Sequence, residues 1–250
     1  MDRERIGKYR IIDELGRGTM GEVYKAFDPV LNRHVALKTL PLKLGPDNFV
    51  LYGQSWGGIL AIEYALAHPD ALKGLVVSNM MSSIPEYNKY AHDVLMPAMD
   101  QKALSEILAI EQKKDYDNPR YEELLMGNFY NQHILRLPVE QWPEPVIRTF
   151  KHLNKPLYTL MQGPSEMGAS GVLENWDRSK DLHLITVPTL VIGAQYDTMD
   201  PKHMEWMSRQ IPHARLLMVP NAGHFAEYDN PQVFFPGLVG FLRDVDAGRF

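Results

Sequence analysis

Three residue types that together perform nucleophilic catalysis occur in the order serine, aspartate, histidine. Ser55 lies in Gly53-Gln54-Ser55-Trp56-Gly57, and Asp197 and His224 each follow an apolar run. A serine hydroxyl attacks a carbonyl well only when a base takes its proton, and a histidine oriented by a carboxylate is the usual base. We therefore expect a catalytic triad of Ser55, Asp197 and His224. Asp200 is a weaker alternative for the acid.

The elements on either side of Ser55 predict a nucleophile elbow. Residues 48–52 form an apolar run typical of a strand, and the small residues of the turn follow it directly. Residues 59–66 then predict a helix with Ile59, Leu60, Ile62, Ala65 and Leu66 on its apolar face, ended by His68-Pro69-Asp70. A serine in this strand–turn–helix context is held clear of the sheet at a helix N-terminus. We expect small residues to be needed at both flanks, because the turn is sharp and the backbone must pass close by.

The other two candidate residues also follow predicted strands, 189–193 before Asp197 and 216–219 before His224. Between them and the elbow, the sequence is longer and more helical than one crossover needs. Residues 101–108 and 121–126 show the apolar periodicity of amphipathic helices. We expect an α/β fold with a helical cap insertion over about residues 80–182, which would shape a substrate pocket and exclude water.

The first 41 residues have a different character. Residues 11–15, 22–27 and 34–38 predict three short strands of an antiparallel β-meander, with Asp28-Pro29 as a turn. A glycine-rich loop lies between the first two strands, and a lysine ends the third. Gly16, Gly18, Gly21, Val23 and Lys38 together resemble the opening of a bacterial-type serine/threonine protein kinase, which implies ATP binding.

The remaining kinase motifs are missing from the sequence. No H-R-D segment supplies a base, and no D-F-G segment holds magnesium, so phosphoryl transfer is not expected. Residues 42–45 read like a helix end closed by glycine, yet no helix precedes them. We therefore predict a join between Lys38 and Leu44, with a kinase-like fragment over residues 1–41 and a hydrolase portion over residues 42–250.

Composition narrows the function classes. The net charge of −5 argues against nucleic-acid binding. Residues 1–41 have a net charge of +2 (8 basic and 6 acidic residues), so the remaining residues have a net charge of −7. The chain has no cysteine and its nine histidines are scattered, so no metal site is expected. The sequence shows neither a signal peptide nor an apolar run of membrane-spanning length. We expect a cytoplasmic protein; its oligomeric state is not predicted.

Several motifs in residues 42–250 together resemble the prolyl aminopeptidases (proline iminopeptidases), a family of α/β-hydrolases. The resemblance implies release of N-terminal proline from peptides or small amides by the serine triad, without a cofactor. It also implies that Glu166 binds the free amine of the substrate, whereas Thr198 stands where some members have a second acid. The motifs are Gly53–Gly58, Met161–Gly168, Trp176-Asp177 and the Gly193-to-Asp197 spacing.

The family also has a part that this sequence lacks. On the order of ninety residues precede the counterpart of Leu42, and they carry an H-G-G-type loop that donates one N–H to the oxyanion. The second oxyanion donor comes from the residue after the nucleophile, here Trp56. No H-G-G segment occurs in this chain. We therefore expect a truncated α/β-hydrolase sheet with an exposed edge at strand 49–52 and impaired turnover.

Three alternatives remain open from the sequence alone. An esterase or amidase with another substrate would use the same triad. A catalytically inactive fusion would serve as an interaction module. A kinase remnant would bind ATP through Lys38 and the glycine loop.

Overall fold

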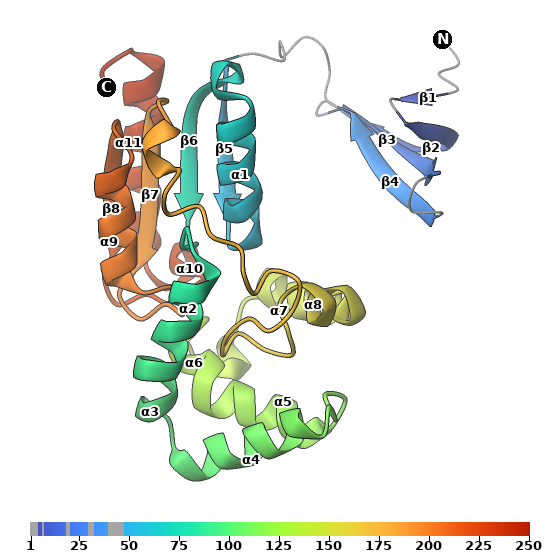
Figure 1. Ribbon diagram of the computed structural model, residues 1–250, viewed down its shortest axis with the longest axis vertical. Coiled ribbons are helices and arrows are strands. Elements are labelled where there is room, and N and C mark those ends of the chain that lie inside the picture. Colours follow the sequence, from blue (N-terminus) through green and yellow to red (C-terminus); the bar gives the residue numbers. More distant parts are fainter. Residues whose placement is uncertain (1–4, 7, 19–20, 30–32, 40–47) are drawn as a thin grey trace. The chain divides into compact units, whose positions relative to one another are not determined.

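The computed structural model describes residues 5–6, 8–18, 21–29, 33–39 and 48–250, with the backbone alone for residues 16–18, 21–23, 33 and 36–39. The chain divides into two compact units, Met1–Phe49 and Val50–Phe250, drawn in Figure 1. The predicted join between Lys38 and Leu44 falls largely on residues 40–47, which lie outside the described residues.

The first unit contains a four-stranded antiparallel sheet. Its strands are β1 (Arg5–Ile6), β2 (Tyr9–Gly18), β3 (Gly21–Asp28) and β4 (Arg33–Thr39), in that order across the sheet. The three strands expected from the sequence are present, and β1 is added to them. Tyr24 and Ala26 are its buried apolar residues in the described part.

The second unit is built on a parallel sheet with the order β5-β6-β7-β8 (Figure 1). These strands are β5 (Phe49–Gln54), β6 (Leu72–Ser78), β7 (Thr189–Ala194) and β8 (Ala214–Val219). The central strand β7 is buried along its whole length, whereas β5 is largely half-buried and Tyr52 is 42% exposed. Among the described residues, β6 is the only strand beside β5.

Helices cover both faces of this sheet. Side chains alternate between faces along a strand, so Val76 and Ile192 contact helix α11 (Pro231–Asp246), while Val77 and Gly193 face α1 (Trp56–Ala67) and α9 (Pro201–Gln210). The prediction for α1 holds except at Leu60, which is 70% exposed. The helix buries Gly58, Ala61, Ile62 and Ala65, the i, i+3, i+4, i+7 stripe, and Leu60 lies off that stripe.

A helical insertion separates β6 from β7 and has its own apolar core, which includes Ile107, Phe129 and Leu135. The expected helices at 101–108 and 121–126 are present within longer or shifted bounds. Two π-helical turns, Ala91–Leu95 and Met126–Tyr130, interrupt the α-helices. The α-helices are α2 (Ile84–Tyr90), α3 (Met96–Ala98), α4 (Gln101–Gln112), α5 (Pro119–Leu125), α6 (Asn131–His133), α7 (Glu144–Lys151) and α8 (Lys155–Met161).

Within the described residues, no helix is long and apolar enough to span a bilayer.

Candidate active site

Ser55 occupies a strained turn between β5 and α1. Its φ of 53° and ψ of −127° are rare for a residue with a Cβ, and such strain occurs mainly at functional positions. The Ser55 N–H donates to the Ser78 carbonyl at 3.0 Å, and the Gly58 N–H donates to the Ser55 carbonyl at 2.7 Å. These bonds fix the elbow, while the Ser55 hydroxyl has no hydrogen-bond partner among the described residues.

Gly53 and Gly57, two residues before and after Ser55, differ in the space available for a side chain. A Cβ on Gly53 would lie 2.1 Å from the Gly57 carbonyl oxygen, so no side chain fits there. A Cβ on Gly57 would meet nothing within 4 Å. The expected need for a small residue is therefore confirmed at Gly53, whereas at Gly57 an added Cβ finds open space. The second tight position is Gly58, where a Cβ would lie 2.6 Å from that of Met80.

Asp197 and His224 form a buried pair at the carboxyl ends of β7 and β8. The Asp197 carboxylate is fully buried, and its Oδ1 lies 2.8 Å from Nδ1 of His224. Burial lowers the pKa of His224, but the charge of Asp197 and the hydrogen bond to it raise that pKa to about 9. Asp200, the alternative acid, instead caps α9 by accepting the Lys202 N–H.

Asn79 orients the acid and was not predicted from the sequence. It directly follows β6, has a φ of 51°, and donates from its side chain to Oδ2 of Asp197 at 2.7 Å. Thr198 donates to Oδ1 of the same carboxylate. Both oxygens of the Asp197 carboxylate thus accept hydrogen bonds.

The helical insertion clamps the loop that carries His224. The N–H groups of His224 and Phe225 donate to the carbonyls of His133 and Ile134, each at 2.8 Å. The His133 ring donates from Nδ1 to the Tyr196 carbonyl at 2.7 Å, beside the acid. One short segment therefore holds both loops of the pair. This contact could not be predicted from the sequence, because His133 lies far from either loop along the chain.

Glu166 lies in a half-buried setting lined by tyrosines. The Tyr158 hydroxyl donates to Oε1 of Glu166, the Tyr87 hydroxyl donates to its carbonyl at 2.6 Å, and the Glu166 N–H donates to the Tyr130 hydroxyl at 3.3 Å. Burial, and then the charge of Glu166, raise the pKa of all three phenols. All three phenols therefore stay protonated, with Tyr158 and Tyr87 as donors and Tyr130 as an acceptor. Oε2 of Glu166 has no partner in the described part of the chain.

An aromatic stack connects this carboxylate to the elbow. The Trp56 ring stacks on Tyr158 with centroids 5.4 Å apart and planes 6° from parallel. The indole N–H of Trp56 donates to Gln162 Oε1 at 3.0 Å. The backbone N–H of Trp56 lies at the first position of α1, where the helix offers it no partner. It can therefore serve as the oxyanion donor expected from the sequence.

The chain is similar to known proteins in both sequence and fold. A family model described as "alpha/beta hydrolase fold" matches residues 30–231. A proline iminopeptidase of Flavobacterium johnsoniae is 54% identical over 80% of this chain and 67% of its own length. Another, of Chitinophaga pinensis, is 42% identical over 94% of this chain and 79% of its own length.

The chain belongs to the proline iminopeptidase family of α/β-hydrolases. The crystal structure of a proline iminopeptidase of Mycobacterium smegmatis agrees with this family assignment: it superposes with a TM-score of 0.72 at 26% identity and covers 83% of this chain and 69% of that one. In the described residues, the part of this chain that has the α/β-hydrolase fold is the parallel sheet β5–β8 with the helices that cover it.

The nucleotide-binding residues expected in the first unit fall within its strands β2, β3 and β4. Gly18 pairs with Gly21 across β2 and β3, and Val23 pairs with Lys38 across β3 and β4. Gly16 lies in β2. The side chains of Val23 and Lys38 lie outside the described residues. ATP binding and the kinase-like origin of this unit stay predictions.

Proposed function

We propose that this chain is a serine hydrolase that releases N-terminal proline from short peptides, with Ser55 as nucleophile, His224 as base and Asp197 as the orienting acid. The observation that carries the proposal is the buried His224–Asp197 pair, which follows β7 and β8 of the same parallel sheet in which β5 leads into the Ser55 elbow. Membership of the proline iminopeptidase family supports the substrate class.

The reaction proceeds in two half-reactions. His224 Nε2 takes the proton of Ser55 as the hydroxyl oxygen bonds to the prolyl carbonyl carbon, and the carbonyl oxygen becomes an oxyanion facing the Trp56 N–H. The C–N bond then breaks, and His224 returns the proton to the leaving amine. Water, deprotonated by His224, next attacks the prolyl ester and frees proline and Ser55.

Glu166 is proposed to recognise the substrate amine. The N-terminal proline carries a secondary ammonium with two N–H donors, and a carboxylate is its natural partner. Oε1 of Glu166 is held by Tyr158, which leaves Oε2 toward the ligand. The stacked rings of Tyr158 and Trp56 supply an apolar surface for the pyrrolidine ring next to the elbow. The helical insertion would thus act as the cap that selects the substrate.

The test measures release of arylamine from a prolyl arylamide and of alcohol from an acyl ester without an amine. We expect the prolyl arylamide to be turned over and Ser55→Ala to abolish this. Glu166→Gln should lower kcat/KM for the arylamide by about ten- to a hundredfold, the value of a hydrogen bond to a charged group, and leave the ester nearly unchanged.

Labelling of Ser55 by a fluorophosphonate distinguishes a slow enzyme from an inactive one. Loss of one oxyanion donor typically lowers turnover roughly 10²–10³-fold, so labelling of Ser55 by a fluorophosphonate is measured alongside. Folded chain that neither labels nor releases arylamine would overturn the proposal. Ester turnover without arylamide turnover would assign the chain to another substrate.

A further inference from the structure

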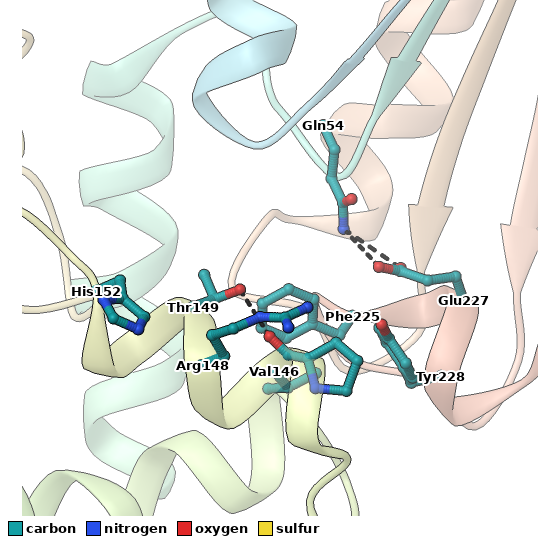
Figure 2. A pocket seen from close by; sticks show the side chains of 9 residues that line it. Gln54, Val146, Arg148, Thr149, His152, Phe225, Glu227 and Tyr228 are labelled. Atoms are coloured by element: carbon teal, nitrogen blue, oxygen red, sulfur yellow. Dashed lines mark hydrogen bonds between the residues drawn. The ribbon is translucent and has the colours of Figure 1, made fainter. Parts of the chain in front are cut away.

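A cavity of about 540 Å³ lies between the helical insertion and the loop that carries His224. Figure 2 shows its walls. Val146 and Arg148 come from α7 of the insertion; Phe225, Glu227 and Tyr228 come from the residues that follow His224; Gln54 comes from the end of β5. It is separate from the aromatic setting of Glu166, with which it shares no lining residue.

The cavity adjoins the loop that carries the base: its lining includes chain neighbours of Ser55 and His224, although neither catalytic residue lines it. Gln54 directly precedes Ser55, and Phe225 directly follows His224. The Gln54 side chain donates to the His224 carbonyl and to the Glu227 carboxylate, each at 3.3 Å. Because His224 must deliver a proton to the nitrogen that leaves, the leaving group of an acyl transfer lies on the side of the histidine. The cavity is therefore placed to hold the leaving group.

Charges of opposite sign stand on opposite walls. Glu227 lies next to the Gln54 amide on the wall nearest His224, and its negative charge contributes to the raised pKa of His224. Arg148 projects from α7 on the other wall, with its side chain 60% exposed and only a 3.5 Å ion pair to Glu144 (Figure 2). The guanidinium therefore retains most of its donors for a ligand.

This polarity matches one kind of leaving group. When the second residue of a dipeptide leaves, its nitrogen takes one proton from His224 and departs as a neutral amine, which becomes an ammonium by taking a second proton from water; its α-carboxylate already carries a negative charge. The ammonium end belongs beside His224 and Glu227, and the carboxylate end belongs across the cavity. A guanidinium binds a carboxylate through two parallel N–H donors, which makes Arg148 the fitting partner.

We propose that this cavity binds the residue that follows the N-terminal proline, and that Arg148 recognises its free α-carboxylate, so that the chain prefers dipeptides over longer or amidated substrates. The inference rests on the proposed function, because it assumes a prolyl substrate at Ser55.

The test compares Pro-Ala with Pro-Ala-amide, which differ only in the terminal carboxylate. Binding to the full chain carrying Ser55→Ala is measured by calorimetry, and proline release by the unmodified chain is measured in parallel. We expect Pro-Ala to bind about ten- to a hundredfold more tightly than its amide. Adding Arg148→Ala should bring the ratio of the two Kd values close to one.

Arg209→Ala is the matched control. Arg209 also lies one helical turn after a glutamate partner, Glu205, and is similarly exposed, but it belongs to α9 and not to the cavity. This variant should keep the full preference for Pro-Ala.

Two outcomes would overturn the inference alone: equal affinity of the unaltered cavity for both ligands, or an unchanged ratio in Arg148→Ala, in a chain that still cleaves prolyl arylamides. If neither ligand binds and prolyl arylamides are not cleaved, the proposed function fails as well. The arylamide has no α-carboxylate, so its turnover separates the two failures.

Discussion

The imidazole of His224 must be neutral to act as a base, but its surroundings favour the protonated form. The buried Asp197 carboxylate lies 2.8 Å from the ring, and it raises the pKa of His224 to about 9 although burial lowers that pKa. Glu166 and Glu227 make smaller contributions in the same direction as Asp197. A base with a raised pKa is protonated at neutral pH. Catalysis should therefore increase with pH well beyond the range of an ordinary histidine.

We expect kcat/KM for a prolyl arylamide to rise with pH along a limb centred near 9. Asp197→Asn should move this limb to lower pH, because it removes the charge that stabilises the imidazolium, and should lower the limiting rate by roughly 10³–10⁴. The measurement is a pH profile from 5 to about 10.5. Asp200→Asn is the control, since Asp200 caps α9 and does not contact His224; its profile should match that of the unaltered chain. A limb near 6.5 in the unaltered chain would contradict the prediction.

The His224–Asp197 pair makes the stability of the fold decrease with rising pH, whereas it makes catalysis increase. A histidine whose pKa is raised on folding stabilises the folded state fully below its unfolded pKa of about 6.5. That contribution is lost as pH rises through about 9. The pH at which His224 becomes a competent base is therefore the pH at which its ion pair ceases to stabilise the fold.

How far the sequence predicts single residues depends on whether their neighbours are local. Ser55 is marked by its own turn, and Asp197 and His224 are marked by the strands before them. Asn79 follows β6 in the same way, but an asparagine at a strand end is common and its partner Asp197 lies far along the chain. The contacts of Glu166 with tyrosines of the insertion are equally non-local and could not be read from spacing.

At the scale of elements, the elbow between β5 and α1 offers a sharp comparison of two glycines. Gly53→Ala forces a Cβ to within 2.1 Å of the Gly57 carbonyl, and overpacking of backbone should lower the free energy of unfolding by about 3 kcal/mol or more. Gly57→Ala meets open space in the first turn of α1 and should change stability by less than about 1 kcal/mol.

Thermal unfolding followed by tryptophan fluorescence measures the difference. All four tryptophans lie after residue 50, so the signal reports the second unit. Gly53→Ala should lower Tm by roughly 6 °C or more at the usual scaling for a unit of this size. Equal effects of the two substitutions would show that the elbow does not have this geometry.

The local sequence pattern predicted the positions of the strands and of helix α1 in this unit better than it predicted which of their side chains are buried. Apolar runs and turn residues placed β5, β7, β8 and α1, because those signals are contained in a few neighbouring residues. Leu60 was assigned to the buried face, yet the sheet contacts a stripe of α1 that excludes it. Which stripe of a helix is buried depends on the element it meets, and that partner is distant in sequence.

On the scale of the whole second unit, the two edges of the parallel sheet differ in how they are protected. Strand β8 carries Arg215, whose guanidinium pairs with Asp244 of α11 at 2.5 Å. Strand β5 has no charged residue, and the exposed Tyr52 lies on it. Charges on an edge strand oppose pairing with another chain, whereas an uncharged apolar edge invites it. The exposed edge expected from the sequence at strand 49–52 stays a prediction; among the described residues, β6 is the only strand that pairs with β5.

We therefore expect concentration-dependent self-association through β5, measurable by sedimentation velocity. Tyr52→Lys should weaken the association roughly tenfold, because β5–β5 pairing of two copies would bring added like charges together. Leu216→Lys is the matched control: it places the same charge on a similarly exposed residue of β8, which is already protected, and should leave the association unchanged. A chain that stays monomeric at high concentration, or an equal effect of both lysines, would show that β5 does not act as an open edge. Self-association that responds only to Tyr52→Lys would identify the strand that precedes the nucleophile as the surface at which copies of this chain meet.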